Sequence, residues 1–284
     1  MFDADRVQEV AQSQLVNTLD LSMFSEKDIL NTVLQRSEVL FDLDRRGLPI
    51  RQWSKGKPEA LQAEVARRGD LLLRRAISVL YLEYLALKPT LDSLAPKHVA
   101  DIGCGYGFID LFIARDFQPA LTLIDLESND ATHFGFHAEA AAYSSLATAR
   151  AFLLANGVAA EAVTMLNPGH EDATRITEVD LALSLLSCGF HYPANTYARF
   201  WESSVRQDGS IILDLREAGA ARQREELSQI GALRDLWRGE KWARVLVSKS
   251  GAKEDGHRML FRMNSDPADH AACLTGPGCL RAGS

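Results

Sequence analysis

Apolar residues recur at helical spacing through about the first 95 residues. In the segment 25–43 they follow one another at intervals of three and four, after Ser25, a candidate N-cap. A second amphipathic run covers 69–89 and is expected to end at Pro89. Between them, 45–59 holds two prolines, two glycines and a tryptophan, which predicts a loop or hinge. Residues 1–95 are therefore expected to form a helical cap or lid.

From about Lys97 onward, short apolar runs alternate with helical segments. Strands are expected near 98–103, 120–127, 162–166, 179–186 and 209–216. A long alanine-rich helix is expected from about His133 to Ala155, and another over 195–207. Strands that alternate with helices predict βαβ units and a parallel sheet.

Two further strands are expected at 241–251 and 256–263. Only a few residues separate them, too few for a parallel crossover, so they predict an antiparallel hairpin at the sheet edge. The expected fold class is α/β: five parallel strands plus this hairpin, over residues 96–265. The remaining residues, 266–284, are small, polar and glycine-containing, and are expected to be a flexible tail.

Composition fits a soluble globular chain, since 46% of its 284 residues are hydrophobic and 24% are charged. Its apolar runs are shorter than the roughly 20 residues of a membrane helix. The acidic, polar start does not resemble a secretion or transit signal, so a cytoplasmic location is expected.

Four cysteines do not indicate a disulfide scaffold. Cys104 and Cys188 lie in apolar, glycine-containing stretches and are expected to stay reduced, whereas Cys273 and Cys279 could pair under oxidation. The spacing of cysteine and histidine fits no structural zinc site, and a metal-free protein is favoured.

The formal charge of −7 argues against a nucleic-acid partner. The segment 45–75 is the exception, with nine Lys or Arg against three acids. One interpretation is a solvated helix face. The other is a cap that receives an anionic substrate, in which Trp53, Lys55 and Lys57 would bind it.

The stretch "DIGCGYG" offers the clearest chemistry. Three glycines, Gly103, Gly105 and Gly107, lie between a predicted strand and a predicted helix, where the backbone can approach a ligand closely. Asp101 precedes the first glycine by two positions. A carboxylate is poorly placed beside a pyrophosphate and better suited to a ligand with a cationic amino-acid end. The spacing also differs from the G-x-G-x-x-G of dinucleotide-binding folds.

With this motif the sequence resembles class I S-adenosylmethionine-dependent methyltransferases, whose first motif is acid-x-Gly-x-Gly-x-Gly. The resemblance implies S-adenosylmethionine as cofactor, bound by the motif including Cys104. It implies that Asp125, 24 residues after Asp101, holds the ribose hydroxyls, with Glu127 as the alternative. It further implies an adenine contact at Asn167, where the family commonly has an acid, and a cofactor contact at Leu185.

The loop after the fourth strand reads "SCGFHYP". In the family this loop lies beside the transferring methyl group, so His191 is the candidate general base for an alcohol acceptor. Phe190 and Tyr192 would line the acceptor site. His191 could instead bind substrate without acting as a base, or play a structural part. Asp214, at the end of the fifth strand, is expected to form a structural ion pair.

Several stretches together resemble sequences provisionally assigned as sugar O-methyltransferases. The expected activity is therefore O-methylation of a small molecule, a sugar or another hydroxyl acceptor that carries a negative charge in one version of the hypothesis. The alternatives are a nucleic-acid methyltransferase, an NAD(P)-dependent oxidoreductase on a related fold, and a binding protein that retains the cofactor. No membrane partner is expected, and a homodimer stays open.

Overall fold

The computed structural model describes residues 3–127 and 144–249. These residues belong to one contact unit, Met1–Ala252, and the second unit, Lys253–Ser284, lies outside the described residues. The expected tail at 266–284, Cys273 and Cys279 therefore lie outside them as well.

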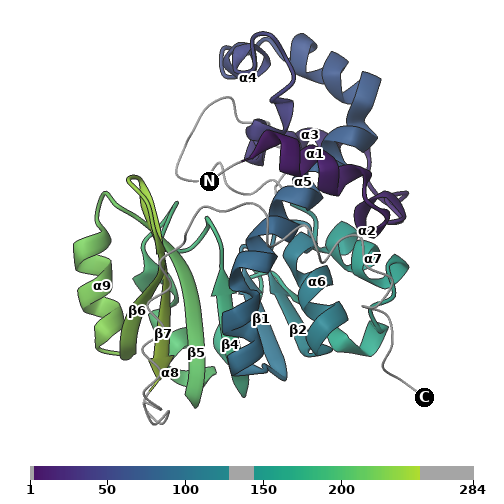
Figure 1. Cartoon of the computed structure of the whole chain (residues 1–284). Coiled ribbons are helices and arrows are strands. Elements are labelled where there is room, and N and C mark those ends of the chain that lie inside the picture. Colours follow the sequence, from purple (N-terminus) through teal and green to yellow (C-terminus); the bar gives the residue numbers. More distant parts are fainter. Residues whose placement is uncertain (1–2, 128–143, 250–284) are drawn as a thin grey trace. The chain divides into compact units, whose positions relative to one another are not determined.

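The centre of the described chain is a seven-stranded sheet with the order β3-β2-β1-β4-β5-β7-β6 (Figure 1). Neighbours among the first five strands run parallel, whereas β7 is antiparallel to both β5 and β6. The strands are β1 (His98–Ile102), β2 (Ala120–Ile124), β3 (Val163–Leu166), β4 (Val179–Ser184), β5 (Val205–Arg216), β6 (Gly231–Arg238) and β7 (Trp242–Lys249). The predicted fold class, five parallel strands plus an antiparallel hairpin, is confirmed.

The hairpin is built from a different pair of segments than predicted. The run at 241–251 does form β7, but its partners are β5 on one side and β6 on the other. The predicted partner, 256–263, lies outside the described residues. The sequence analysis predicts no strand at 231–238. The apolar residues of β6 are interrupted by Arg234 and Asp235, and several of its side chains are exposed at the edge of the described sheet.

Apolar side chains cover both faces of the sheet, as is typical when parallel strands are joined by helices. On one face, strand residues such as Leu123 and Leu183 pack with the N-terminal helices, α5, α6 (Phe108–Phe117) and α7 (Leu146–Ala155). On the other, Ile211 and Val245 pack with α8 (Ala198–Ser203) and α9 (Ala220–Ser228).

The N-terminal region is helical, as predicted, but its elements differ in length. It contains α1 (Ala4–Gln12), α2 (Gln14–Asn17), α3 (Glu26–Gln35), the 3₁₀ turn η1 (Ser37–Leu40), α4 (Leu48–Trp53) and α5 (Glu59–Leu94). Ser25 caps α3 in a capping box with Asp28, as its position suggested. The predicted loop at 45–59 was wrong in part, since it contains α4, which has a proline in its first turn.

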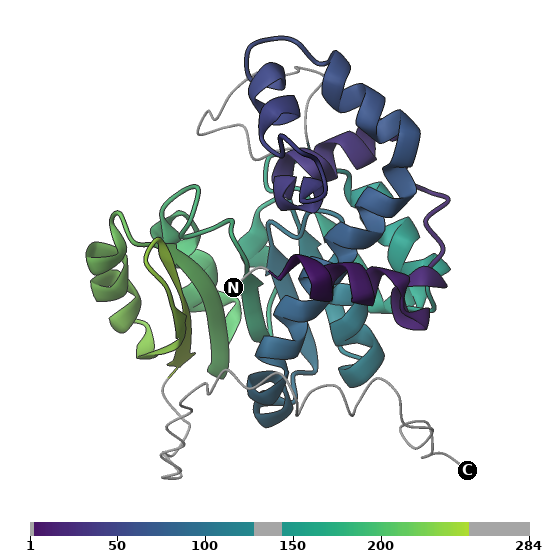
Figure 2. The ribbon, with the colours of Figure 1, turned by 45° about the horizontal axis from the view of Figure 1, so that its top comes forward.

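Helix α5 continues through Pro89, where we expected it to end. Leu87 and Leu91, which flank the proline, are 2% and 0% exposed, so packing on both sides outweighs the cost of the proline. The helix is kinked at Arg68, whose φ is −150°. It packs against α1, α3 and α4 and also against α6, so one helix joins the N-terminal region to the sheet (Figure 2).

Two other predicted helices are shorter in the structure. The alanine-rich helix begins at Leu146 with Ser145 as N-cap, and residues 128–143 lie outside the described part. The helix predicted over 195–207 is the 3₁₀ turn η4 (Ala194–Tyr197) followed by α8, and residues from Val205 on belong to β5. The shorter 3₁₀ turns η2 (Ala160–Ala162) and η3 (Ala173–Arg175) flank β3.

Candidate cofactor and acceptor site

The glycine-rich turn joins the carboxyl end of β1 to the start of α6. Gly103, Gly105 and Gly107 have φ values of +76°, +58° and +70°, a region that favours glycine. A Cβ at Gly103 would lie 2.0 Å from the Oγ of Ser187, in the loop after β4. The absence of a side chain at Gly103 therefore lets the loops after β1 and β4 approach each other closely.

Hydrogen bonds fix this turn to the end of β2. The Gly103 N–H donates to the carbonyl of Ile124 at 2.7 Å. The Gly105 N–H donates to Oδ2 of Asp125 at 2.8 Å. Asp125 thus lies at the glycine turn, beside the motif of the family that the sequence resembles. Cys104, between Gly103 and Gly105, is buried and forms no disulfide in the described residues.

Three carboxyl groups are buried around the turn: Asp101 on β1, Asp110 on α6 and Asp125 after β2 are 4%, 0% and 9% exposed. Asp101 and Asp110 lie within hydrogen-bond reach of each other, and apart from this contact Oδ1 of Asp101 and both carboxyl oxygens of Asp110 have no hydrogen-bond partner in the described ranges. None of these three carboxyl groups has an ion-pair partner among the described residues. Buried polar groups normally have partners, so this site is suited to a cationic ligand.

The pKa values reflect this burial. Burial raises the pKa of Asp110 and of Asp125 to about 7. Burial, and then the neighbouring Asp110 carboxyl, raise the pKa of Asp101 well above its ordinary value. A cation bound here would offset the desolvation of the carboxylates. Asp110 was not among the residues that the motif suggested, because a single acid in a helical run carries no sequence signal.

The residues that follow β2 and β3 lie near one another. Oδ1 of Asn167 accepts a hydrogen bond from the Gly169 N–H at 2.9 Å, so this side chain shapes its own turn. A Cβ at Gly169 would lie 3.4 Å from the side chain of Leu126, which is 51% exposed. Oε1 of Glu127 accepts from the Leu146 N–H at the start of α7, which leaves Asp125 as the acid beside the glycines.

The loop after β4 has an unusual backbone. Leu185 is half-buried against the core, and Leu186 has a φ of +51°, which is rare for a residue with a side chain. Its N–H donates to Oδ2 of Asp214 at 3.0 Å. Asp214 also pairs with Arg244 on β7 through two oxygens, at 2.7 and 2.8 Å, as expected of a structural ion pair.

This ion pair extends to the N-terminal helices. Arg244 contacts Glu83 of α5 at 3.2 Å, and Glu83 pairs with Arg36 at 2.9 Å. A series of ion pairs therefore connects the segment after α3, through α5, to the loop after β4.

Phe190, His191 and Tyr192 line one cavity of about 410 Å³, together with Arg216 and residues of α9. His191 is exposed, and its ring packs edge-to-face against the ring of Phe190, with 5.1 Å between the ring centroids. The burial of its covered part, and then the charge of Arg216, lower the pKa of His191. The Tyr192 hydroxyl lies 3.1 Å from Oγ of Ser187, the residue above Gly103.

Helix α3 also reaches the glycine turn. The Tyr106 hydroxyl donates to Oδ1 of Asp28 at 3.0 Å, and a Cβ at Gly105 would lie 3.7 Å from Oε1 of Gln35. The ring of Phe24 packs edge-on against Tyr106. The sequence could not reveal these contacts, because they join residues 70 or more positions apart.

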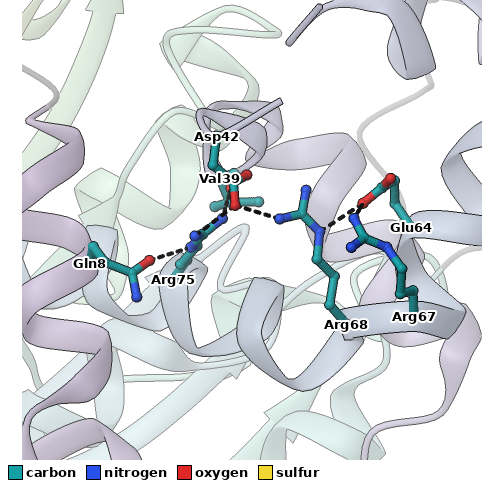
Figure 3. A network of polar contacts seen from close by, with 7 residues as sticks. All are labelled: Gln8, Val39, Asp42, Glu64, Arg67, Arg68 and Arg75. Atoms are coloured by element: carbon teal, nitrogen blue, oxygen red, sulfur yellow. Dashed lines mark hydrogen bonds and ion pairs between the residues drawn. The ribbon is translucent and has the colours of Figure 1, made fainter. Parts of the chain in front are cut away.

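Four of the nine basic residues in the segment 45–75 form ion pairs, namely Arg67, Arg68, Arg74 and Arg75. Three of these four are drawn in Figure 3. Arg68 bonds to both Glu64 and Asp42, and Arg75 bonds to Asp42 and to the Val39 carbonyl. Trp53 is 7% exposed in the core, while Lys55 and Lys57 are exposed after α4, which packs on α5. The structure thus does not bring these three residues together with the loop after β4.

The described residues contain neither a candidate metal-binding group nor a candidate membrane-spanning helix. Between residues 3–127 and 144–249, no group of three or more His, Cys, Asp or Glu is arranged to hold a metal ion. None of the helices described in those ranges is long and apolar enough to cross a membrane.

Comparison with known proteins yields similarity to solved structures alone. No protein-family model and no curated protein sequence matches the chain. The S-adenosylmethionine-dependent methyltransferase SibL is 13% identical, with a TM-score of 0.48 over 76% of this chain and 74% of SibL. An O-methyltransferase family protein from Burkholderia thailandensis is 12% identical, with a TM-score of 0.40 over 63% of this chain and 61% of its own.

A protein from Nostoc punctiforme PCC 73102, provisionally assigned as an O-methyltransferase, is 10% identical, with a TM-score of 0.46 over 63% of this chain. The chain spans about 59% of the length of that Nostoc protein. The solved structures named here are all of methyltransferases. The fold class of this chain is established by its own strand order. The activities named for the solved structures are those of the solved proteins.

Proposed function

We propose that this protein is an S-adenosylmethionine-dependent methyltransferase that methylates a hydroxyl group of a small molecule, a sugar or another alcohol. The observation that carries the proposal is the set of buried carboxyls at the glycine turn, of which Asp101 and Asp110 have only each other as side-chain partners in the described chain and no cation. The cofactor's amino-acid end carries an ammonium group beside its carboxylate, and its sulfonium carries a further positive charge that makes the whole molecule cationic. Both fit a site that has excess negative charge and little water.

The residues at the turn would divide the binding as follows. Asp101 would accept hydrogen bonds from the ammonium group, and the Asp125 carboxylate would accept from the ribose hydroxyls. The exposed Leu126 and the turn at Asn167 would contact the adenine, and Leu185 would line the same cleft. A dinucleotide would instead place its pyrophosphate against these carboxyls, which disfavours the NAD(P)-dependent alternative.

When bound, the cofactor supplies an electrophilic methyl group on a positively charged sulfur. The S–CH₃ bond breaks as an O–CH₃ bond forms, and the acceptor hydroxyl gives up its proton. His191 would take that proton, because its lowered pKa keeps the imidazole neutral at pH 7 and able to accept. The Tyr192 hydroxyl has a raised pKa and so stays a hydrogen-bond donor.

Calorimetry on the full chain tests the cofactor. S-adenosylmethionine and S-adenosylhomocysteine should bind saturably, and NADH and NADPH should not. Gly103→Ala should abolish the binding because its Cβ would lie 2.0 Å from Ser187 Oγ. Gly157→Ala is the matched control: its φ is +94°, yet no atom lies within 4 Å of the added Cβ. Equal loss of binding in both variants would contradict the role of the Gly103 turn.

The chemistry is tested with a cell metabolite extract as source of acceptors. S-adenosylhomocysteine should accumulate, and kcat/KM should fall with decreasing pH below the ordinary histidine value of about 6.5. His191→Gln should lower turnover by roughly 100-fold with little change in cofactor affinity. Full turnover in this variant would exclude His191 as the base. Methylation of added DNA or RNA in place of small molecules would favour the nucleic-acid alternative.

A further inference from the structure

The cavity beside the loop after β4 has walls from separate parts of the chain. Residues 189–193 form one wall, Arg216 at the end of β5 a second, and the first turns of α9 a third. Its volume, about 410 Å³, lies within the range of small-molecule sites. The cofactor assignment above does not use this space.

We propose that this cavity binds an anionic group of the methyl acceptor, a carboxylate or a phosphate, with Arg216 as the principal cation. The proposal rests on the proposed function and specifies its substrate class. It moves the anion site away from Lys55 and Lys57, which the basic run in the sequence had suggested.

The charges that line the cavity support this placement. Arg216 is exposed, and no carboxylate of the described residues lies within ion-pair distance of its guanidinium, which sits 5.8 Å from the Phe190 ring centroid. Arg222 differs, because it pairs with Oε1 of Glu226 at 2.8 Å. With His191 neutral, one positive charge is left over, and a guanidinium can bind a carboxylate or phosphate through two parallel hydrogen bonds.

The backbone at the start of α9 adds to the same polarity. Gly219 is the N-cap residue of α9 and lines the cavity. As a glycine it has no side-chain oxygen to cap the first N–H groups of the helix. The first N–H groups of a helix favour negative charge. Arg216 and this first turn thus act on the same space from two sides.

Two side chains, Tyr192 and Ser187, connect the cavity to the glycine turn. Tyr192 lines the cavity, and the Tyr192 hydroxyl contacts Ser187, whose side chain lies directly over Gly103. One pair of side chains therefore separates the cavity from the turn where the cofactor would lie. An acceptor held by its anionic group on Arg216 would be fixed on the methyl-receiving side.

The cavity can be probed directly through the His191 ring, since His191 lines it. The Cε1–H signal of His191, assigned among the seven histidines with His191→Gln, is followed by NMR in the full chain. Inorganic phosphate and acetate are titrated separately at constant ionic strength. At least one should shift the signal saturably. Phosphate alone would indicate a phosphoester acceptor, acetate alone a carboxylate acceptor, and both an acceptor of either kind.

Substitutions then locate the cation. Arg216→Gln should weaken the binding by about tenfold or more, and Arg216→Lys, which keeps the charge, should retain most of it. Arg238→Gln, at an exposed arginine on β6, is the matched control and should change nothing. Thermal melts of each variant show that it folds. Absence of a saturable shift with both anions, or a dependence on Lys55 and Lys57 instead of Arg216, would overturn the proposal.

Calorimetry with S-adenosylhomocysteine on the same samples separates the two proposals. If this ligand binds and neither anion does, the anion site fails and the cofactor assignment stands. If an anion binds at Arg216 and S-adenosylhomocysteine does not, the proposed function fails and the anion site stands.

Discussion

Buried charges occur in two parts of this molecule under opposite conditions. Around α5, buried arginines have carboxylate partners: Arg75 bonds to Asp42, and Arg244 bonds to Asp214 and Glu83. At the glycine turn, Asp101 and Asp110 are at least as buried, yet each has the other acid as its neighbour and no cationic partner in the described chain. The first arrangement contributes to folding, and the second costs folding energy and suits a ligand.

Breaking a paired charge should have the largest effect. Asp214→Asn removes the carboxylate that Arg244 contacts at 2.7 Å and leaves a buried guanidinium partly uncompensated. We expect a loss of about 3 kcal/mol of unfolding free energy, measured by urea denaturation. Asp92→Asn breaks an exposed pair with Lys88 and should cost about 0.5 kcal/mol or less. Equal losses in the two variants would contradict the distinction.

Removing an unpartnered charge should have the opposite sign. Because the folded pKa of Asp110, about 7, lies above the unfolded value of about 3.9, the folded state binds the proton more tightly. Stability from this group is highest below pH 4 and falls as the pH rises to about 7. Asp110→Asn should therefore raise stability by on the order of 2 kcal/mol at pH 8 and by little at pH 4. A gap that does not widen with pH would count against this.

Asp42 shows the paired case in its pH dependence. Burial raises its pKa, but hydrogen bonds and charges from Arg75 and Arg68 outweigh this and lower the pKa to about 2. Its stabilisation is present above the unfolded value of about 3.9 and is lost as the pH falls towards 2. Asp42→Asn should cost about 1 kcal/mol at pH 7, a value reduced for its partial exposure, and nothing at pH 2. Melts at both pH values check this.

The smallest effect is expected where charge is exposed and unconnected to either arrangement. The double variant Lys55→Gln, Lys57→Gln should change stability by less than about 0.5 kcal/mol. Its affinity for S-adenosylhomocysteine, measured by calorimetry, should stay within about twofold of the original. A large loss of affinity would place these lysines at the cofactor after all.

What the sequence could predict followed from local pattern. The buried parallel strands are continuous apolar runs, and the glycine spacing with Asp101 predicted the turn at the end of β1. Strand β6 was missed because an edge strand needs no such run. The sequence predicts a helix end at Pro89, because the packing of Leu87 and Leu91 that outweighs the proline is tertiary and leaves no local signal.

For the candidate site, the sequence could predict only the residues that belong to the glycine motif or follow a strand directly. Asp101 and Asp125 follow from motif and strand position. Ser187 over Gly103, the orphaned Asp110 and Arg216 beside His191 depend on which loops meet in space. The pairing of the basic residues at 45–75 was predictable only where it is local: Arg74 pairs with Asp70 four positions away, whereas Arg75 is 33 positions from Asp42.

Helix α5 has a consequence for building chimaeras of this protein. Its 36 residues pack on α1, α3 and α6, with a single break in helical geometry at Arg68. A crossover at residue 95, between the helix and β1, would carry with the N-terminal part the side chains that cover the sheet. A crossover at the break would leave that cover in place but would separate Arg75 from its partners Gln8 and Asp42. An exchanged set of N-terminal helices would therefore have to keep both of those residues.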